Sequence, residues 1–314
     1  MSRARRWPEG LQRYGLVLAF VGLILLLSLL SPAFLSVTNL INVLRQVAVN
    51  AILALGMTVV IIKGGIDLSV GSLLALSGAV AAGLSLAGWP VLPSMAVALT
   101  LGVLAGAAQG WLVAYAGLPP FIVTLAGLTV FRGLTLVYTD GRPITGLPEA
   151  FLILGGGEWL GVPVPIWVMV IFFATTHFLL RWTALGRALY AVGGNEEATR
   201  LSGVPVPQVK VFAYAFSGLA SGLAALVLTG RLNSAQPTAG TGFELDAIAA
   251  AVVGGASLAG GRGNAWGTLL GALIIGVLNN GMNLLNVSSF YQLIVKGLVI
   301  LGALLFDQLV VRRK

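Results

Sequence analysis

The sequence contains no cysteine and only one histidine, His177. The absence of cysteine excludes disulfides, thiolate metal sites and thiol catalysis. A single histidine leaves no basis for a histidine-rich metal site. Charged residues are also scarce, because they make up 9% of the 314 residues, whereas a soluble protein carries roughly 25%. A soluble fold of this composition would expose large apolar patches, so lipid must cover much of the surface.

Most of the chain is apolar. Hydrophobic residues make up 58% of the chain, and glycine contributes 42 residues, which is typical of membrane helices that pack closely. The sequence therefore predicts an all-α, polytopic membrane protein with residues 1–314 in a single transmembrane domain. A span needs roughly 20 helical residues. Pro, Gly and polar segments divide the chain into about ten spans: 16–30, 39–62, 68–87, 94–115, 121–138, 166–180, 211–229, 245–258, 266–285 and 291–310.

The positions of the basic residues predict an orientation. Thirteen of the eighteen lie in segments that the ten-span topology places on one side, as expected for cytoplasmic loops, so both termini are expected in the cytoplasm. They do not form one basic face, which disfavours a nucleic-acid partner. Three others, Arg45, Arg132 and Lys296, fall within spans and should face protein or water. The thirteen are Arg3, Arg5, Arg6, Arg13, Lys63, Arg181, Arg187, Arg200, Lys210, Arg262, Arg312, Arg313 and Lys314.

Part of the sequence is repeated at an offset of 196 residues. Residues 50–76 align with residues 246–272 without a gap, and eight of the 27 positions are identical. Each copy consists of a helix, a Gly-Gly break and a Gly-[Ser/Thr]-Leu-Leu segment that opens the next helix. Both copies have the same orientation in the ten-span topology, as in the parallel repeats of transporters. The alternative is chance similarity between segments rich in Gly, Ala and Leu.

The polar segment 182–208 predicts a short helix of about two turns at the membrane face, held there by a Gly-Gly pair. Asn195 suits the N-cap, and the two glutamates after it favour a helix start. Gly203 and Pro205 end the helix. A partner could move such a helix as a rigid body; the alternative is an ordinary amphipathic loop helix. The candidate residues are Gly193, Gly194, Asn195, Glu196, Glu197, Ala198, Arg200, Leu201, Ser202 and Gly203.

The segment GGIDLSVGS at 64–72 is typical of a turn followed by a helix start. Asp67 or Ser69 can cap the following helix, and Lys63 can meet Asp67 or the carbonyls at the end of the preceding helix. Capping is one interpretation of this segment, and a gate or a subunit contact is the other. The residues assigned to the second role are Gly64, Gly65, Asp67, Ser69 and Gly71.

The chain has no P-loop. The pattern G-x-x-x-x-G-K-[ST] requires a Gly-Lys pair, and no lysine in this sequence follows a glycine. An ATP-driven transporter built on this chain would need a separate polypeptide to bind ATP and Mg. The alternative is an ion-coupled secondary carrier, which usually has a carboxylate deep in the bundle. All ten acidic residues fall in loops or near predicted helix ends, which disfavours that alternative.

Seven ordered segments resemble one known family. They are GGIDLSVGS at 64–72, LGRALYAVGGNEEATRLSG at 185–203, SAQPTAGTG at 234–242, ELDAIAA at 244–250, GTLLGA at 267–272, NNGMNLL at 279–285 and VKG at 295–297. Nearly the whole chain, most densely from residue 185 onward, resembles the ribose-type permease subunits of bacterial ABC monosaccharide importers. The resemblance implies a non-catalytic, cofactor-free homodimeric pore in the bacterial inner membrane. It also implies a cytoplasmic ABC ATPase, whose groove receives the coupling segment 182–208, and an extracytoplasmic sugar-binding protein.

A sugar pathway needs groups that hydrogen-bond hydroxyls without holding the substrate tightly. Amide side chains in or near the spans are suitable, although a hydrogen bond between helices is the alternative role for each. The candidates are Gln46, Asn50, Gln109, Asn233, Gln236, Asn279, Asn280 and Asn283. Ribose is the expected substrate by resemblance, since residues 66–69 resemble the sugar branch. Xylose, autoinducer-type furanoses, nucleosides and branched-chain amino acids stay open as alternatives.

Overall fold

The computed structural model describes residues 9–311, with the side chains of residues 15–302 and 305. Six basic residues that contribute to the orientation prediction lie outside the described residues: Arg3, Arg5, Arg6, Arg312, Arg313 and Lys314. The helices are α1 (Glu9–Leu30), α2 (Val37–Ile62), α3 (Val70–Leu86), α4 (Val91–Ala114), α5 (Pro120–Thr139), α6 (Glu149–Gly156), α7 (Val164–Trp182), α8 (Ala184–Gly194), α9 (Glu196–Leu201), α10 (Val206–Leu232), α11 (Phe243–Val253), α12 (Ala265–Leu284) and α13 (Ser289–Val311). The strands are β1 (Ile144–Thr145), β2 (Glu158–Trp159), β3 (Val162–Pro163) and β4 (Ser234–Ala235).

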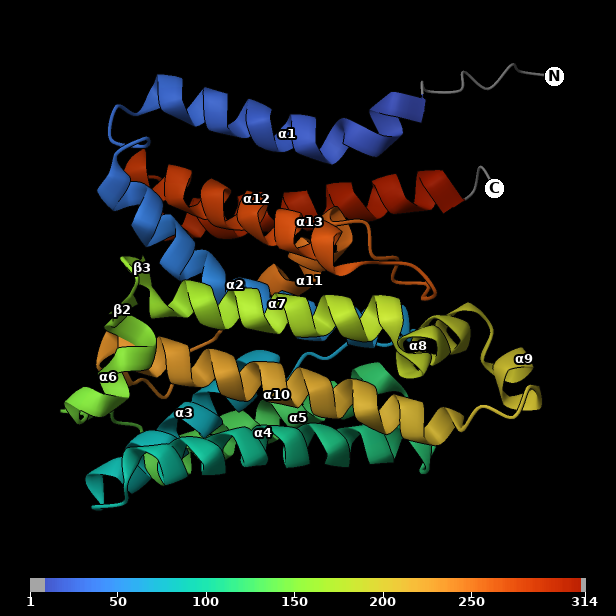
Figure 1. Ribbon diagram of the computed structural model, residues 1–314, viewed down its shortest axis with the longest axis horizontal. Coiled ribbons are helices and arrows are strands. Elements are labelled where there is room, and N and C mark those ends of the chain that lie inside the picture. The colour runs from blue at the N-terminus through green and yellow to red at the C-terminus, as the bar shows by residue number, and fades with distance from the viewer. Residues whose placement is uncertain (1–8, 312–314) are drawn as a thin grey trace.

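The long helices lie side by side in a bundle (Figure 1). Helices α1, α12 and α13 form one side of it, α4 and α5 form the opposite side, and α2, α7 and α10 lie between them. The short helices α8 and α9 lie at one end of the bundle, where α1 begins and α13 ends. Helix α6 and the hairpin of β2 and β3 lie at the other end.

The prediction of an all-α, polytopic membrane protein is confirmed. Within the described residues, six helices are long and apolar enough to cross a membrane: α2, α4, α5, α7, α10 and α12. Three shorter apolar helical stretches lie at 15–30, 70–86 and 289–302. The expected span 245–258 is only the 11-residue helix α11, because the chain turns at Gly254 and at Gly255, where φ is +91°. At 1.5 Å per residue, α11 covers about 16 Å, roughly half of the hydrocarbon thickness.

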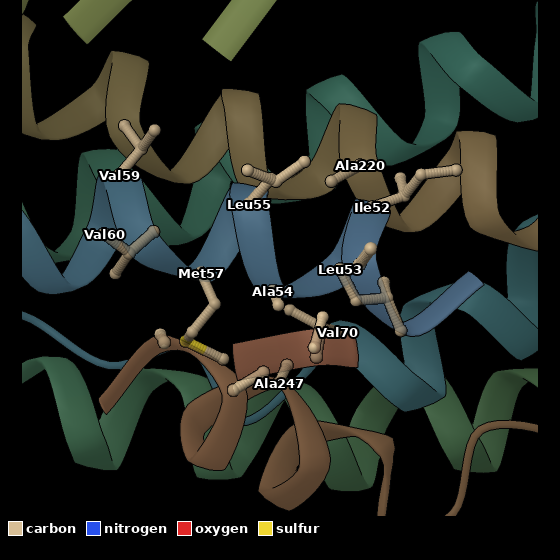
Figure 2. Close-up of a cluster of buried hydrophobic side chains, with 14 of the residues drawn as sticks. Ile52, Leu53, Ala54, Leu55, Met57, Val59, Val60, Val70, Ala220 and Ala247 are labelled. Carbon is tan, nitrogen blue, oxygen red and sulfur yellow. The ribbon is translucent and has the colours of Figure 1, made fainter. Parts of the chain in front are cut away.

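Helix α2 forms the centre of the hydrophobic core. In its most apolar stretch of 18 residues, 83% is buried inside the protein. Figure 2 shows side chains of α2, including Ile52, Leu53 and Met57, packed with Val70 of α3, Ala220 of α10 and Ala247 of α11. A Cβ placed on Gly56 would lie 2.6 Å from the Cβ of Ala220. Glycine at this position therefore lets the backbones of α2 and α10 approach closely.

Two elements differ from the sequence prediction. The segment between the expected spans 121–138 and 166–180, for which the sequence predicted no helix or strand, contains α6 and the β2–β3 hairpin, and β1 pairs with β4 in an antiparallel two-residue ladder. The segment 182–208 contains two helices, α8 and α9, instead of one. The pair Gly193-Gly194 forms the last residues of α8 and does not lie in a loop. Helix-to-helix contacts here outweigh the weak helix propensity of glycine.

Candidate coupling segment and translocation pathway

Helices α8 and α9 follow one another without an intervening loop. The Thr183 hydroxyl caps α8 by accepting a hydrogen bond from the backbone N–H of Gly186 at 2.9 Å. Asn195 ends α8 and starts α9, and its Oδ1 accepts from the N–H of Ala198 at 2.9 Å. Because one residue joins the two helices, a force on α9 is applied directly to α8. The predicted N-cap at Asn195 is confirmed.

Two ion pairs stabilise α9 from within the chain. The Glu196 Oε1 lies 2.6 Å from the Nζ of Lys210, which ties α9 to the start of α10. The Glu197 carboxylate accepts from the Arg200 guanidinium at 2.6 Å. Leu201, the last residue of α9, has a side chain that is 79% exposed. It lies four residues after Glu197 and so on the same side of the helix, where a partner protein that packs against α9 would contact it.

The loop 63–69 carries a buried polar network around Asp67, which is fully buried. One oxygen of Asp67 accepts from the Ser69 hydroxyl at 2.6 Å and from the Ser69 backbone N–H at 3.0 Å. The other oxygen accepts from the Ser217 hydroxyl of α10 at 2.8 Å. The Gln109 amide of α4 donates to the Ser69 hydroxyl at 2.9 Å. These bonds join the loop to α4 and α10.

Two expectations for this segment are corrected. Ser69 precedes α3 but makes no capping bond with its side chain, because its hydroxyl is used by Asp67 and Gln109. The Lys63 Nζ donates to the Tyr214 hydroxyl at 3.0 Å, instead of to Asp67 or to the carbonyls of α2. Lys63 lies beyond the end of α2, and burial lowers its pKa to about 7. A buried lysine without a bonded carboxylate favours its neutral form.

The three cationic residues within predicted spans all contact protein, as expected. Arg45 pairs with Glu158 at 3.1 Å. The Arg132 guanidinium donates to the carbonyls of Pro237 and Ala239 and thereby fixes the loop between α10 and α11. The burial of the acidic side chains Asp67 and Asp246 was not evident from the sequence, because a position near a helix end does not reveal whether a side chain is buried.

Lys296 of α13 pairs with Asp246 of α11, with Nζ and Oδ2 2.9 Å apart. The Asp246 side chain is 5% exposed, so its charge lies in the interior although it is the fourth residue of its helix. Asp67 in its loop and Asp246 near the start of α11 thus have the positions expected for acidic residues, but both side chains are buried within the protein. Ion pairs placed inside a membrane protein mark positions of structural or functional importance.

The chain is similar in sequence to known transport proteins. Residues 39–304 match the family described as branched-chain amino acid transport system / permease component. The chain belongs to this permease family. The permease is 54% identical over 294 residues to the ribose import permease protein of Haemophilus influenzae, covering 92% of this chain and 91% of that protein. It is 53% identical to the ribose import permease protein of Bacillus subtilis, with 95% and 93% covered.

A more distant relative is named for xylose instead of ribose. The permease is 37% identical to the xylose transport system permease protein of Escherichia coli, over 96% of this chain and 93% of that protein. No solved structure matches the chain. Members of the family are transport components, so the permease is a non-catalytic subunit, in agreement with the expectation from the missing P-loop.

The eight amides considered for the permease's pathway are divided among several elements. They lie on α2, α4 and α12 and in the segment after α10. Several already have protein partners: Asn280 exchanges two hydrogen bonds with Asn39, and Asn283 accepts from Gln292 at 2.8 Å. Asn233 accepts from the Leu147 N–H, and Gln236 donates to Ser234. Gln46 and Asn50 are half-buried on α2, and Asn279 Oδ1 is buried without a partner among the described residues.

Proposed function

We propose that the permease is the membrane-spanning subunit of an ATP-driven importer for ribose. The assignment of ribose as the substrate rests on the identity of 53–54% to ribose import permeases over more than nine-tenths of the chain. Identity to the xylose permease is lower, at 37%, which supports ribose over xylose. The family is described by branched-chain amino acid transport, but the relatives at 37–54% identity are named for ribose and xylose.

The proposal includes two kinds of partner protein. A separate cytoplasmic ABC ATPase binds ATP and Mg and contacts the coupling segment 182–208, with Leu201 at the contact. The capped helix α9, its exposed Leu201 and the absence of a Gly-Lys pair support this assignment. An extracytoplasmic sugar-binding protein delivers ribose to the opposite face, and two copies of the permease form the pore in the bacterial inner membrane.

The proposal also includes ten spans with both termini in the cytoplasm. The ten consist of the nine longer apolar stretches and, as the shortest, α11, which alone covers only about half of the hydrocarbon thickness. The start of α1 and the end of α13 lie at the end of the bundle that carries α8 and α9 (Figure 1), which supports a common side. Arg181, Arg187 and Lys210 lie at that end as well, in agreement with a cytoplasmic face.

A parallel repeat is supported by the helix bounds. Adding 196 to α1 (9–30), α2 (37–62), α3 (70–86) and α4 (91–114) gives 205–226, 233–258, 266–282 and 287–310; helices α10, α11, α12 and α13 occupy 206–232, 243–253, 265–284 and 289–311. The repeat thus extends over four helices, of which only the second pair differs strongly in length. Each half then contributes one Gly-Gly break to the mechanism.

Within this mechanism, we assign the segment 64–71 to a gate that opens and closes between the helices. The side chains of Asp67 and Ser69 are fully buried inside the chain, which favours a gate over a subunit contact. Gly71 lies against Gly240 of the loop that Arg132 fixes. The half-buried amides Gln46, Asn50 and Asn279 are the candidates for ribose contact, since no described partner occupies their side chains fully.

Reconstitution tests this function. The permease is inserted into vesicles with its ATPase and sugar-binding protein, and uptake of labelled ribose is measured. We expect uptake only when all three proteins and ATP are present. Uptake that continues without the ATPase, or that follows an imposed proton gradient, would refute the proposal and favour a secondary carrier.

A further inference from the structure

The two Gly-Gly breaks of the internal repeat, 64–65 and 260–261, meet in the structure. The backbone N–H of Gly261 donates to the carbonyl of Ile62, the last residue of α2, at 2.8 Å. A Cβ placed on Gly260 would lie 3.1 Å from the Cα of Gly64. Gly64 and Gly260 have φ of +86° and +87°. The end of α2 is therefore bonded directly to the loop 254–264 between α11 and α12.

The last turn of α8 packs onto this contact through Gly193. A Cβ at Gly193 would lie 1.8 Å from the Ile62 carbonyl oxygen and 2.6 Å from the Gly261 nitrogen. No side chain fits at this position without moving backbone, so close approach requires glycine here. We call Gly64, Gly193, Gly260 and Gly261 the glycine junction. The adjacent Gly194 has no atom within 4 Å of the place where its Cβ would lie.

A second contact fixes the orientation of α8 at the junction. The Tyr190 hydroxyl, about one turn before Gly193, donates to the Gly263 carbonyl at 2.7 Å. Leu189 and Val192 of the same helix are buried. Two attachment points and a buried face hold α8 rigidly against the loop 254–264. Since α9 follows α8 without a loop, displacement of α9 is applied to the junction.

We infer that the glycine junction transmits movement of the coupling segment to both halves of the permease at once, and that Gly193 is the positioning residue at its centre. One contact reaches the end of α2 through Ile62. The other reaches the loop 254–264 through Gly261. A single displacement of α8 therefore acts on equivalent breaks of the two repeats, instead of on one helix. This inference rests on the proposed ATP-driven function.

The test compares two helical glycines. Gly193→Ala forces backbone apart at the junction, whereas Gly133→Ala in α5 introduces the same methyl group where no atom lies within 4 Å and serves as the matched control. In vesicles with ATPase and binding protein, we expect Gly193→Ala to retain ATP hydrolysis. The amount of ribose transported per ATP should fall roughly tenfold, within the range of coupling between distant sites. Gly133→Ala should match the wild-type chain.

Tyr190→Phe is the second variant, because it keeps the ring and removes only the hydrogen bond to Gly263. We expect ribose per ATP to fall several-fold, with the ATPase still bound; this variant decides the question if Gly193→Ala does not assemble. Equal coupling in Gly193→Ala and Gly133→Ala would overturn the inference. So would a wild-type ratio in Tyr190→Phe, or parallel loss of hydrolysis and transport in Gly193→Ala. Wild-type vesicles without ATP-dependent uptake would instead refute the proposed function.

Discussion

The ion pair between Asp246 and Lys296 leads to a prediction with both a size and a direction. Removing one partner of a buried pair costs about 3–5 kcal/mol, because the other charge stays buried and unpaired. The Asp246 side chain is 5% exposed and the Lys296 side chain is 26% exposed. Leaving the carboxylate without its partner therefore costs more free energy than leaving the ammonium group without its partner. We expect Lys296→Met to lower the free energy of unfolding by about 3 kcal/mol, the lower end of that range.

Asp246→Asn should cost less than Lys296→Met. The lysine that it leaves behind lies two turns into α13 and can extend its long side chain toward the membrane surface. The double variant with Asp246→Asn and Lys296→Met loses the same ion pair only once. Its loss of stability should therefore be smaller than the sum of the two single losses. The exposed pair of Arg142 and Asp140, 3.9 Å apart, provides the control, because Arg142→Met should change stability by less than about 1 kcal/mol.

The assay is equilibrium unfolding of the purified permease in detergent, with the four variants measured side by side. A larger loss for Asp246→Asn than for Lys296→Met would contradict the reasoning from burial. Additive losses in the double variant would show that the two side chains do not form a stabilising pair. Either result would remove the ion pair as the attachment between α11 and α13.

Two further predictions concern the end of the bundle that carries α8 and α9. Leu201→Asp should reduce the ATPase that co-purifies with the permease roughly tenfold, as loss of an apolar anchor does, while Leu201→Met should not; equal co-purification of both would contradict a contact at Leu201. Because the pKa of Lys63 is about 7 in the folded chain and 10.5 when unperturbed, unfolded chain binds more protons between these values, and stability should rise with pH. The measurement is the unfolding midpoint at about pH 7 and about pH 9, and Lys63→Met should abolish the rise between the two. A rise that persists in Lys63→Met would contradict the assignment of the effect to Lys63.

Local signals in the sequence were sufficient for the short elements. The cap at Asn195 and the stop at Gly203 and Pro205 predicted α9 to within a few residues, because capping depends on neighbours in the chain. The six long spans were also predicted from apolar length. Helix α11 was not, since its length depends on a turn at Gly254 and Gly255 that packing against other segments requires.

Contacts between distant segments were not predictable from one sequence. Asp246 and Lys296 are 50 residues apart, and Asp67 and Ser217 are 150 apart. Their pairing depends on how α10, α11 and α13 pack, which apolar periodicity does not determine. The repeat did contain a usable signal, because the identical Gly-Gly breaks at 64–65 and 260–261 could have indicated one shared contact.

The central claim is that this chain imports ribose with energy from a partner ATPase. The most direct measurement is accumulation of labelled ribose in vesicles that hold the permease, its ATPase and its binding protein, oriented so that ATP reaches the ATPase. The account predicts accumulation against a gradient with ATP and none with a non-hydrolysable analogue. Equal accumulation with the analogue, or transport of leucine in place of ribose, would contradict it.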